Sequence, residues 1–209
     1  VEDVAAAGPA ALPILPADVA RPWLPDGGDT PEHRVTLLAE NLGRLRADVR
    51  RVPDLAAAAG LVGTLVAERG WTRVAWHGHA TVDPLVTPLG VETYRVDGGP
   101  FDAATLESCA AGITACDAAV AQTGSILVSS GTCGGRAISI LPHVHVVVVP
   151  VGLVVGTLRD AFDLVRKGHG GRLPSMLSFI TGPSRTGDIE RILVLGAHGP
   201  KELIVVLVG

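Results

Sequence analysis

The segment Phe179–Glu190 combines the residue types that hold an anion. It reads Phe-Ile-Thr-Gly-Pro-Ser-Arg-Thr-Gly-Asp-Ile-Glu, in which a Gly-Pro turn precedes a serine that can cap a helix and acids suited to a first helical turn. Such a helix start leaves backbone N–H groups free, and with Arg185 beside them these groups suit phosphate or carboxylate. The alternative is an ordinary capped turn in which Arg185 pairs with Asp188 or Glu190.

Other polar loops follow apolar segments that are predicted to be strands. In an open α/β sheet, ligands gather beyond the carboxyl ends of the strands. If these loops converge, their hydroxyls, backbone N–H groups and charged side chains would bind a phosphorylated, carboxylated or CoA-like ligand. The candidate ligand-binding residues are Thr123, Gly124, Ser129, Ser130, Gly131, Arg136, His145, Gly182, Ser184, Arg185, Thr186, Asp188 and His198.

Two acids and one histidine are candidates for acid–base catalysis. Asp117 and Glu190 would need shifted pKa values and a substrate within reach. Their alternatives are structural, because Asp117 can hydrogen-bond a turn and Glu190 can pair with Arg185 or Arg191. His145 either lines a pocket or satisfies a hydrogen bond in the core. The sequence contains no Gly-x-Ser-x-Gly nucleophile motif and no Walker loop.

Two His-x-His pairs, His77/His79 and His143/His145, would each place two imidazoles on one face of a strand. No third ligand has a fixed spacing from either pair, so no metal site is predicted.

The three cysteines, Cys109, Cys116 and Cys133, include no Cys-x-x-Cys pair, which excludes a local iron–sulfur or zinc-ribbon site. No cofactor is therefore expected. Their odd number makes a disulfide framework unfavourable, so a reducing cytoplasm is expected. We expect the cysteines to act as small buried hydrophobic residues. Cys133, in a glycine-rich loop, is the one thiol to test for reactivity.

Several segments together resemble a known family. They are Ile180–Glu190, Leu193–Leu203, Asp117–Gly131, Arg136–Pro142 and Val144–Val148. The chain is similar to the lactate-utilisation protein C family (the LUD domain), well over about residues 110–209 and loosely before them. The family commonly has Glu before Thr-Gly, where this chain has Gln122. If that carboxylate does chemistry elsewhere in the family, this chain lacks it.

The resemblance implies the α/β fold shared by sugar-phosphate isomerases, CoA transferases and formyltetrahydrofolate cyclo-ligases. This fold is a mixed, mainly parallel sheet with helices on both faces. It also implies a subunit or accessory protein of bacterial L-lactate utilisation, which oxidises lactate to pyruvate with iron–sulfur partner proteins. The alternatives are a stand-alone enzyme acting on a nucleotide, CoA ester, folate or sugar phosphate, and a homo-oligomeric binding module without catalysis.

Composition limits the classes of partner. Of 209 residues, 47% are hydrophobic and 18% are charged, and the net charge is −4. No basic surface is available for a nucleic-acid backbone, so nucleic acid is not expected as a partner. The most apolar stretch, residues 137–156, is interrupted by prolines and histidines, so a buried strand is predicted there rather than a membrane span. No signal peptide is visible.

Residues 1–30 are rich in Ala, Pro and Gly and are predicted to form an extended or mobile N-terminal segment. Residues 31–209 are predicted to form a single domain, with hydrophobic patterns that alternate between helix and strand. The predicted helices are residues 31–51, 53–69, 101–111 and 155–167, with single turns near 84–85 and 136–141. The predicted strands are residues 71–76, 91–96, 117–120, 125–129, 144–149, 191–195 and 203–208. Of these, 117–120 and 125–129 would form a hairpin, and the last two would pair.

Overall fold

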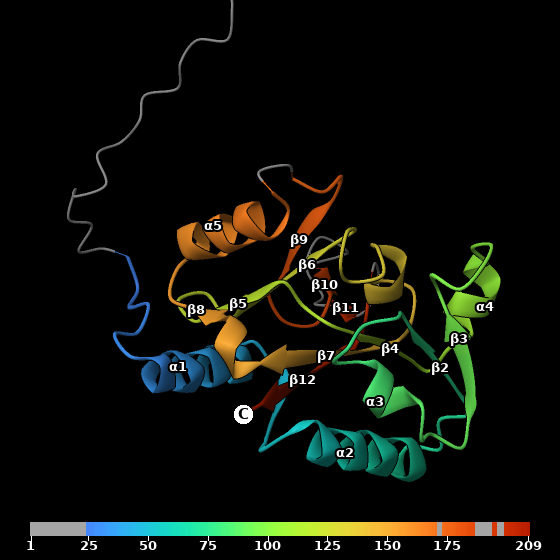
Figure 1. The fold of residues 1–209 in the computed structure, drawn as a ribbon. Helices are drawn as coiled ribbons and strands as arrows, with labels where there is room; N and C mark the ends of the chain where they lie inside the picture. The colour runs from blue at the N-terminus through green and yellow to red at the C-terminus, as the bar shows by residue number, and fades with distance from the viewer. Residues whose placement is uncertain (1–23, 171–172, 187–193, 196–198) are drawn as a thin grey trace, which may run out of the picture.

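The computed structural model describes residues 24–170, 173–186, 194–195 and 199–209. A six-stranded sheet lies at its centre, with every strand parallel to its neighbours (Figure 1). In spatial order the strands are β1 (Asp48–Val52), β12 (Glu202–Val208), β7 (Val144–Pro150), β4 (Ala111–Thr114), β2 (Arg73–Trp76) and β3 (Glu92–Arg95). The chain runs outward from β2 to β3 and then returns past β2 to β4 and β7. The adjacent strands β2 and β4 therefore form the point at which the strand order reverses, where α/β sheets open a crevice.

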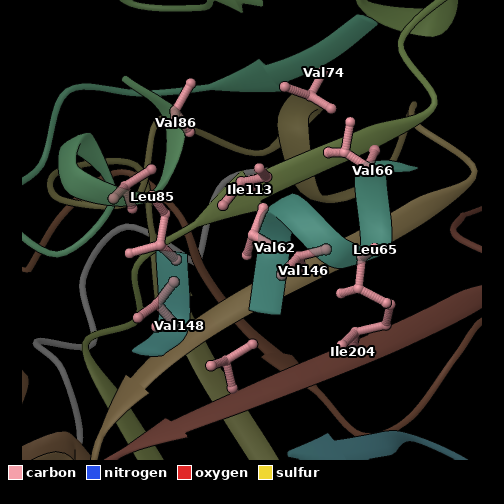
Figure 2. Packing of buried hydrophobic residues seen from close by; sticks show 14 of the residues in the cluster. Val62, Leu65, Val66, Val74, Leu85, Val86, Ile113, Val146, Val148 and Ile204 are labelled. Atoms are coloured by element: carbon pink, nitrogen blue, oxygen red, sulfur yellow. The ribbon is translucent and has the colours of Figure 1, made fainter. Parts of the chain in front are cut away.

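Helices α2 (Leu55–Glu68) and α3 (Asp83–Val86) cover one face of this sheet. Val62 of α2 and Leu85 of α3 pack with Ile113, Val146 and Ile204 of the central strands (Figure 2). The strands β7 and β12 are buried on both faces, which explains their nearly continuous runs of Val, Leu and Ile.

The opposite face is covered by helix α1 (Pro31–Arg44) and by a smaller, four-stranded sheet. The smaller sheet consists of β8 (Val154–Val155), β5 (Ala118–Val120), β6 (Ser125–Ser129) and β9 (Leu177–Ile180). Helix α5 (Leu158–Gly168) packs on its outer face. The remaining elements are α4 (Ala103–Glu107), the 3-10 turns η1 (Ala137–Ser139) and η2 (Val151–Leu153), and a ribbon of β10 (Arg185–Thr186) with β11 (Val194–Leu195).

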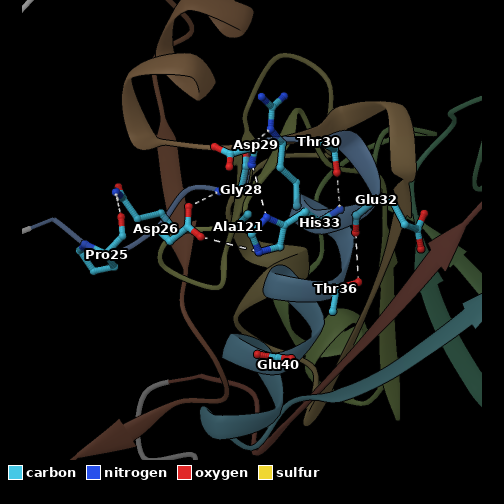
Figure 3. A network of polar contacts seen from close by, with 12 residues as sticks. Pro25, Asp26, Gly28, Asp29, Thr30, Glu32, His33, Thr36, Glu40 and Ala121 are labelled. Carbon is cyan, nitrogen blue, oxygen red and sulfur yellow. Dashed lines mark hydrogen bonds and ion pairs between the residues drawn. The ribbon is translucent and has the colours of Figure 1, made fainter.

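A polar network joins the residues before α1 to the rest of the domain (Figure 3). The Thr30 side chain caps α1 by accepting a hydrogen bond from the His33 N–H at 3.1 Å. The Pro25 carbonyl accepts one from Gln122 Nε2 at 2.6 Å. A glutamate at position 122 would present only acceptors to that carbonyl when ionised, so the amide suits this contact. The division of the chain at residue 30 remains a proposal.

The predicted fold class is confirmed, and so are the hairpin of β5 with β6 and the buried strand β7. No helix among the described residues is long and apolar enough to cross a membrane.

The prediction of one helix over residues 31–51 was wrong at its end. Helix α1 stops at Arg44, where the Ala47 N–H turns back to the Leu42 carbonyl at 3.0 Å and Arg46 adopts a left-handed φ of 68°. The Arg46 N–H also donates to the Gly43 carbonyl at 2.9 Å, and these two hydrogen bonds together form the Schellman motif that ends many helices. The following residues then pair with β12 as the edge strand β1.

The helix predicted over 101–111 was also too long, because only Ala103–Glu107 is helical. The next segment, Ala111–Thr114, is β4, which lies between β7 and β2. Its four residues carry no alternating pattern, so burial on both sides determines its structure.

The predicted pairing of the two C-terminal strands was wrong as well. Strand β12 is parallel to both β1 and β7, whereas β11 pairs with β10. The apolar residues of β12 are better buried in the middle of the central sheet than they would be in a surface hairpin.

Candidate functional site

A cavity of about 280 Å³ lies beyond the carboxyl ends of β2 and β3, beside the point at which the central sheet reverses its strand order. His77 and Gly78 directly follow β2, and Asp97 closely follows β3. A third wall is the loop after β6. We call this hollow the switch-point cavity; its lining residues are His77, Gly78, Asp97, Ser130, Gly131, Thr132, Gly134 and Gly135.

A larger hollow of about 560 Å³ lies at the opposite edge of the sheet, before β2 and β3. It is lined by Gly63, Trp71, Pro88, Val91 and their neighbours, and none of its lining residues is titratable. A ligand there would find little to orient its polar groups. We therefore regard the smaller, polar cavity as the better site.

His77 ties two strand ends together at the switch-point cavity. Its ring is 2% exposed, and its Nε2 accepts a hydrogen bond from the N–H of Ala115, just after β4, at 3.1 Å. Because that nitrogen accepts, the proton of the neutral ring lies on Nδ1. Burial, and then the neighbouring His79, lower the pKa of His77. His77 is thus a neutral residue whose hydrogen bond connects the ends of β2 and β4.

Asp97 is a fixed negative charge on the next wall. Arg95 Nε donates to its Oδ1 at 2.8 Å, and the Gly78 N–H lies 3.2 Å from both carboxylate oxygens. The Arg95 contact, aided by the Gly78 N–H, holds the pKa of Asp97 at about 2. The guanidinium of Arg95 also lies 5.2 Å from the centre of the Trp76 ring. The positive charge of Arg95 is therefore largely neutralised within this wall.

The loop after β6 supplies hydrogen-bond donors. The backbone N–H groups of Gly131, Thr132, Gly134 and Gly135 donate to no acceptor among the described residues. Gly134 has a φ of 73°, and a Cβ built on it would lie 2.7 Å from His77 Cβ. The loop thus approaches the histidine as closely as only glycine permits. Free N–H groups in a glycine-rich turn are a common way to hold an anion.

Asp117 lies behind this loop and organises its hydroxyls. The half-buried carboxylate accepts a hydrogen bond from the Thr132 hydroxyl, and Cys133 Sγ lies 3.5 Å from its second oxygen. The Ser129 hydroxyl lies 3.0 Å from Thr132 Oγ1. Burial, and then the charge of Asp117, raise the pKa of the Cys133 thiol to about 12. Cys133 is therefore a poor nucleophile, and the structure argues against the reactivity considered from its sequence position.

A second group of predicted residues lies elsewhere, at the C-terminal end of α1. The Arg185 guanidinium donates to the Leu45 carbonyl, and Gly182 packs against the same carbonyl. Gly124 packs against Asn41 of α1. Strand β6 separates this group from the switch-point cavity by about 15 Å, at about 3.4 Å per residue. The predicted ligand residues thus form two groups: Thr123, Gly124, Gly182, Ser184 and Arg185 in one, and Ser129, Ser130 and Gly131 in the other.

Replacing Arg185 by alanine is expected to weaken the end of α1 while leaving ligand binding at the cavity unchanged. The exposed guanidinium bonds a helix-end carbonyl, so we expect a loss of about 1 kcal/mol. The thermal midpoint should fall by roughly 2–4 °C. Arg136→Ala is the control for stability, because that exposed side chain makes no hydrogen bond within the described residues. Unchanged stability with lost ligand binding would instead make Arg185 a ligand contact.

His145 lies inside the core rather than in either group. Its Nε2 lies 2.9 Å from Thr114 Oγ1, and the ring is 1% exposed. Its Nδ1 has no hydrogen-bond partner among the described residues. Burial lowers the pKa of His145 to about 3, so the ring is neutral at physiological pH and has no solvent access for proton transfer. These contacts fit the structural alternative better than the catalytic one.

The other predicted residues have varied positions. Arg136 is exposed at the end of the cavity loop, and its carbonyl accepts from Ser139 Oγ at 2.9 Å. Thr186 lies in β10. The residues Asp188, Glu190 and His198, and the predicted helix start at 187–190, lie outside the described part of the chain. No cluster of three potential metal ligands occurs among the described residues.

Several cavity residues escaped the sequence reasoning, above all Asp97, Thr132 and Gly134. The sequence pattern indicates His77 only as half of a His-x-His pair. The available signal was position, since His77 directly follows a predicted strand at 71–76 and Asp97 directly follows one at 91–96. Both positions therefore satisfy the rule that ligands gather beyond the carboxyl ends of strands.

Comparisons with known proteins fit this architecture. A family model described as the LUD domain matches residues 102–208. Lactate utilization protein C of Bacillus subtilis (strain 168) is 34% identical over 117 residues, which are 55% of this chain and 49% of that protein. Its namesake in Shouchella clausii is 38% identical over 98 residues, or 46% and 43% of the two chains. The chain thus spans about half the length of the curated relatives it matches.

Among solved structures, a DUF162 family protein from Deinococcus radiodurans superimposes with a TM-score of 0.65 at 26% sequence identity. The match covers 86% of this chain and 99% of that one. The similarity therefore extends well beyond the segment matched by the family model.

Proposed function

The chain belongs to the LUD domain family, and on this basis we propose that it acts in bacterial lactate utilisation as a subunit that binds a small anionic molecule. The names of its relatives in Bacillus subtilis and Shouchella clausii support a role in lactate utilisation. The switch-point cavity supports the binding role. Its position beyond the carboxyl ends of β2 and β3 is where sheets of this kind hold ligands.

The observation that carries this proposal is the set of free N–H donors in the wall of a polar cavity. Four loop residues that line the cavity have N–H groups without acceptors in the described residues. Neutral His77 and the Arg95-paired Asp97 hold the walls in place. An anion could therefore replace solvent on preformed donors, with little rearrangement of the protein.

The size of the cavity favours a small ligand. Its volume of about 280 Å³ lies at the lower end of the roughly 300–1,000 Å³ typical of ligand pockets. A carboxylic acid of a few carbons would fit, whereas a whole CoA ester, folate or nucleotide would protrude. This favours the lactate-utilisation role over a stand-alone enzyme acting on those larger molecules.

One observation supports the enzymatic alternative. Asp117 lies directly behind Thr132 at the cavity wall, so an acid–base group is within one hydrogen bond of a bound ligand. Turnover of a small acid by the isolated chain, lost in Asp117→Asn, would support it.

The redox chemistry of lactate oxidation would lie in partner proteins. The three cysteines of this chain do not have the spacing that holds a cluster. We therefore propose that iron–sulfur proteins act alongside it, in the cytoplasm, where its unpaired cysteines would stay reduced. A tagged chain should retain such proteins when purified from lactate-grown cells. Retention of no iron–sulfur protein, under conditions that preserve known complexes, would contradict the partnership.

The binding role is tested by thermal shift on the purified chain. The panel should contain lactate, pyruvate, inorganic phosphate, acetyl-CoA, ATP and a folate. A ligand at about a thousand times its Kd adds about 4 kcal/mol, which means roughly 8–16 °C for a chain of this length. We expect a shift with small carboxylates, and the same shift in Arg185→Ala. The absence of a shift with every compound would overturn the binding role.

A further inference from the structure

The hydroxyl of Thr132 has a fixed hydrogen-bond direction. A threonine hydroxyl has a single hydrogen, and in this structure it is donated to Asp117 Oδ1. The Ser129 hydroxyl, 3.0 Å away, must therefore donate to Thr132 Oγ1 rather than accept from it. One lone pair of Thr132 Oγ1 remains. Thr132 is exposed and lines the switch-point cavity, so its hydroxyl can offer a ligand an acceptor and no donor, in addition to the free backbone N–H.

Asp117 maintains this direction. The charged carboxylate accepts hydrogen bonds only. Its other oxygen lies 3.5 Å from Cys133 Sγ, whose hydrogen points to it. The backbone N–H of Asp117 bonds the Leu127 carbonyl at 2.8 Å, which fixes the residue against β6. The Thr132 hydroxyl hydrogen is thus held away from the cavity.

The rest of the cavity wall disfavours a ligand with more than one negative charge. The N–H groups of the loop offer donors, but no Lys or Arg is among the residues that line the cavity in the described part of the chain. Arg95 is already paired with Asp97, and Arg136 directly follows the lining residue Gly135. Two carboxylates near the cavity would repel a dianion such as phosphate more than a monocarboxylate.

We infer that the switch-point cavity distinguishes a 2-hydroxy acid from the matching 2-oxo acid, with Thr132 as the residue that reads the difference. The inference rests on the proposed binding function. The carboxylate of the acid would occupy the N–H groups of the loop. The 2-hydroxyl would donate to Thr132 Oγ1, whereas a 2-oxo group would face that acceptor with another acceptor. The chain would therefore bind the substrate of a lactate oxidation in preference to its product.

The test is calorimetric titration of the full chain with L-lactate and with pyruvate. Lactate gains a neutral hydrogen bond to Thr132, whereas pyruvate leaves that acceptor unpaired. We therefore expect lactate to bind about tenfold more tightly than pyruvate. In Thr132→Val, which keeps the shape and removes the acceptor, lactate should bind more weakly and the preference should disappear. In Thr132→Ser, which restores a hydroxyl, it should return. In Asp117→Asn the amide can donate to Thr132, so the preference should fall.

The outcomes separate this inference from the function on which it rests. Equal binding of both acids by the wild-type chain, or tighter binding of pyruvate, would overturn the claim that Thr132 distinguishes the two acids. It would leave the proposed binding role intact. A preference that survives in Thr132→Val would equally overturn it. Binding of neither acid at millimolar concentration would overturn the inference together with a small-carboxylate ligand. The wild-type ratio needs no variant, so the test holds even if one variant fails to fold.

Discussion

Gly134→Ala is expected to abolish ligand binding at the switch-point cavity and to cost about 2–3 kcal/mol of stability. Alanine in the left-handed region costs about 1–2 kcal/mol, and Gly134 has a φ of 73°. The new methyl group would also lie 2.7 Å from His77 Cβ, a position fixed by the backbone of β2. The loop must therefore move away, and its N–H groups would no longer face a ligand in one arrangement.

Gly135→Ala is the matched control for this change. Gly135 also has a positive φ, of 86°, but a Cβ there would meet no atom within 4 Å. It should share the conformational penalty without displacing the loop from His77. Urea unfolding and calorimetric titration of both variants give the comparison. If Gly134→Ala binds ligand as well as Gly135→Ala does, contact between the loop and His77 is not what shapes the site.

Acid is expected to destabilise the fold through His145, well above the pH at which carboxylates titrate. In the unfolded chain the ring takes up a proton below its ordinary pKa of 6.5, whereas in the folded chain its pKa is about 3. The unfolded state therefore binds more protons between these two values, and stability falls as the pH is lowered. At about 1.4 kcal/mol per pH unit, the loss between pH 6.5 and 5 is about 2 kcal/mol.

His145→Gln isolates this contribution, because an amide can still hydrogen-bond Thr114 but does not titrate. The pKa of His77 is also lowered, so that residue adds a loss of the same sign in both proteins. Asp97, with its pKa of about 2, gives up its stabilisation only at lower pH. Urea unfolding at pH 7, 6 and 5 should show a steeper loss for the wild-type chain than for the variant. Parallel losses would mean that His145 is not buried as a neutral ring.

Sequence patterns predicted the elements that carry their own local signal. The valine run of β7 indicated a strand buried on both faces, and Gln122-Thr-Gly124 between two apolar runs indicated the hairpin of β5 and β6. Strand β4 gave no such signal. Its sequence, Ala-Gly-Ile-Thr, becomes a central strand only because β7 and β2 pair with it from both sides. Strand β1 likewise depends on β12, a partner some 150 residues away in the chain.

The candidate site shows the same limit. The family signature led to Arg185, whose guanidinium bonds the end of α1 in the structure. The sequence indicates only part of the loop from Ser130 to Gly135. This loop forms a cavity only together with His77 and Asp97, which follow β2 and β3. Pairing between distant segments is set by the topology of the sheet, and no local periodicity records it. The order of β2 and β4 had to be known before their shared crevice could be placed.

The most direct test of the central claim is a nitrogen–proton correlation spectrum of the labelled chain, recorded while L-lactate is added. If a small carboxylate binds in the switch-point cavity, the backbone amide signals of Gly131, Thr132, Gly134 and Gly135 should move most, and together. The side-chain signals of His77 should respond with them. Saturating changes at Gly182 and Arg185, with the loop signals unmoved, would place the ligand at the end of α1 and contradict the assignment of the site.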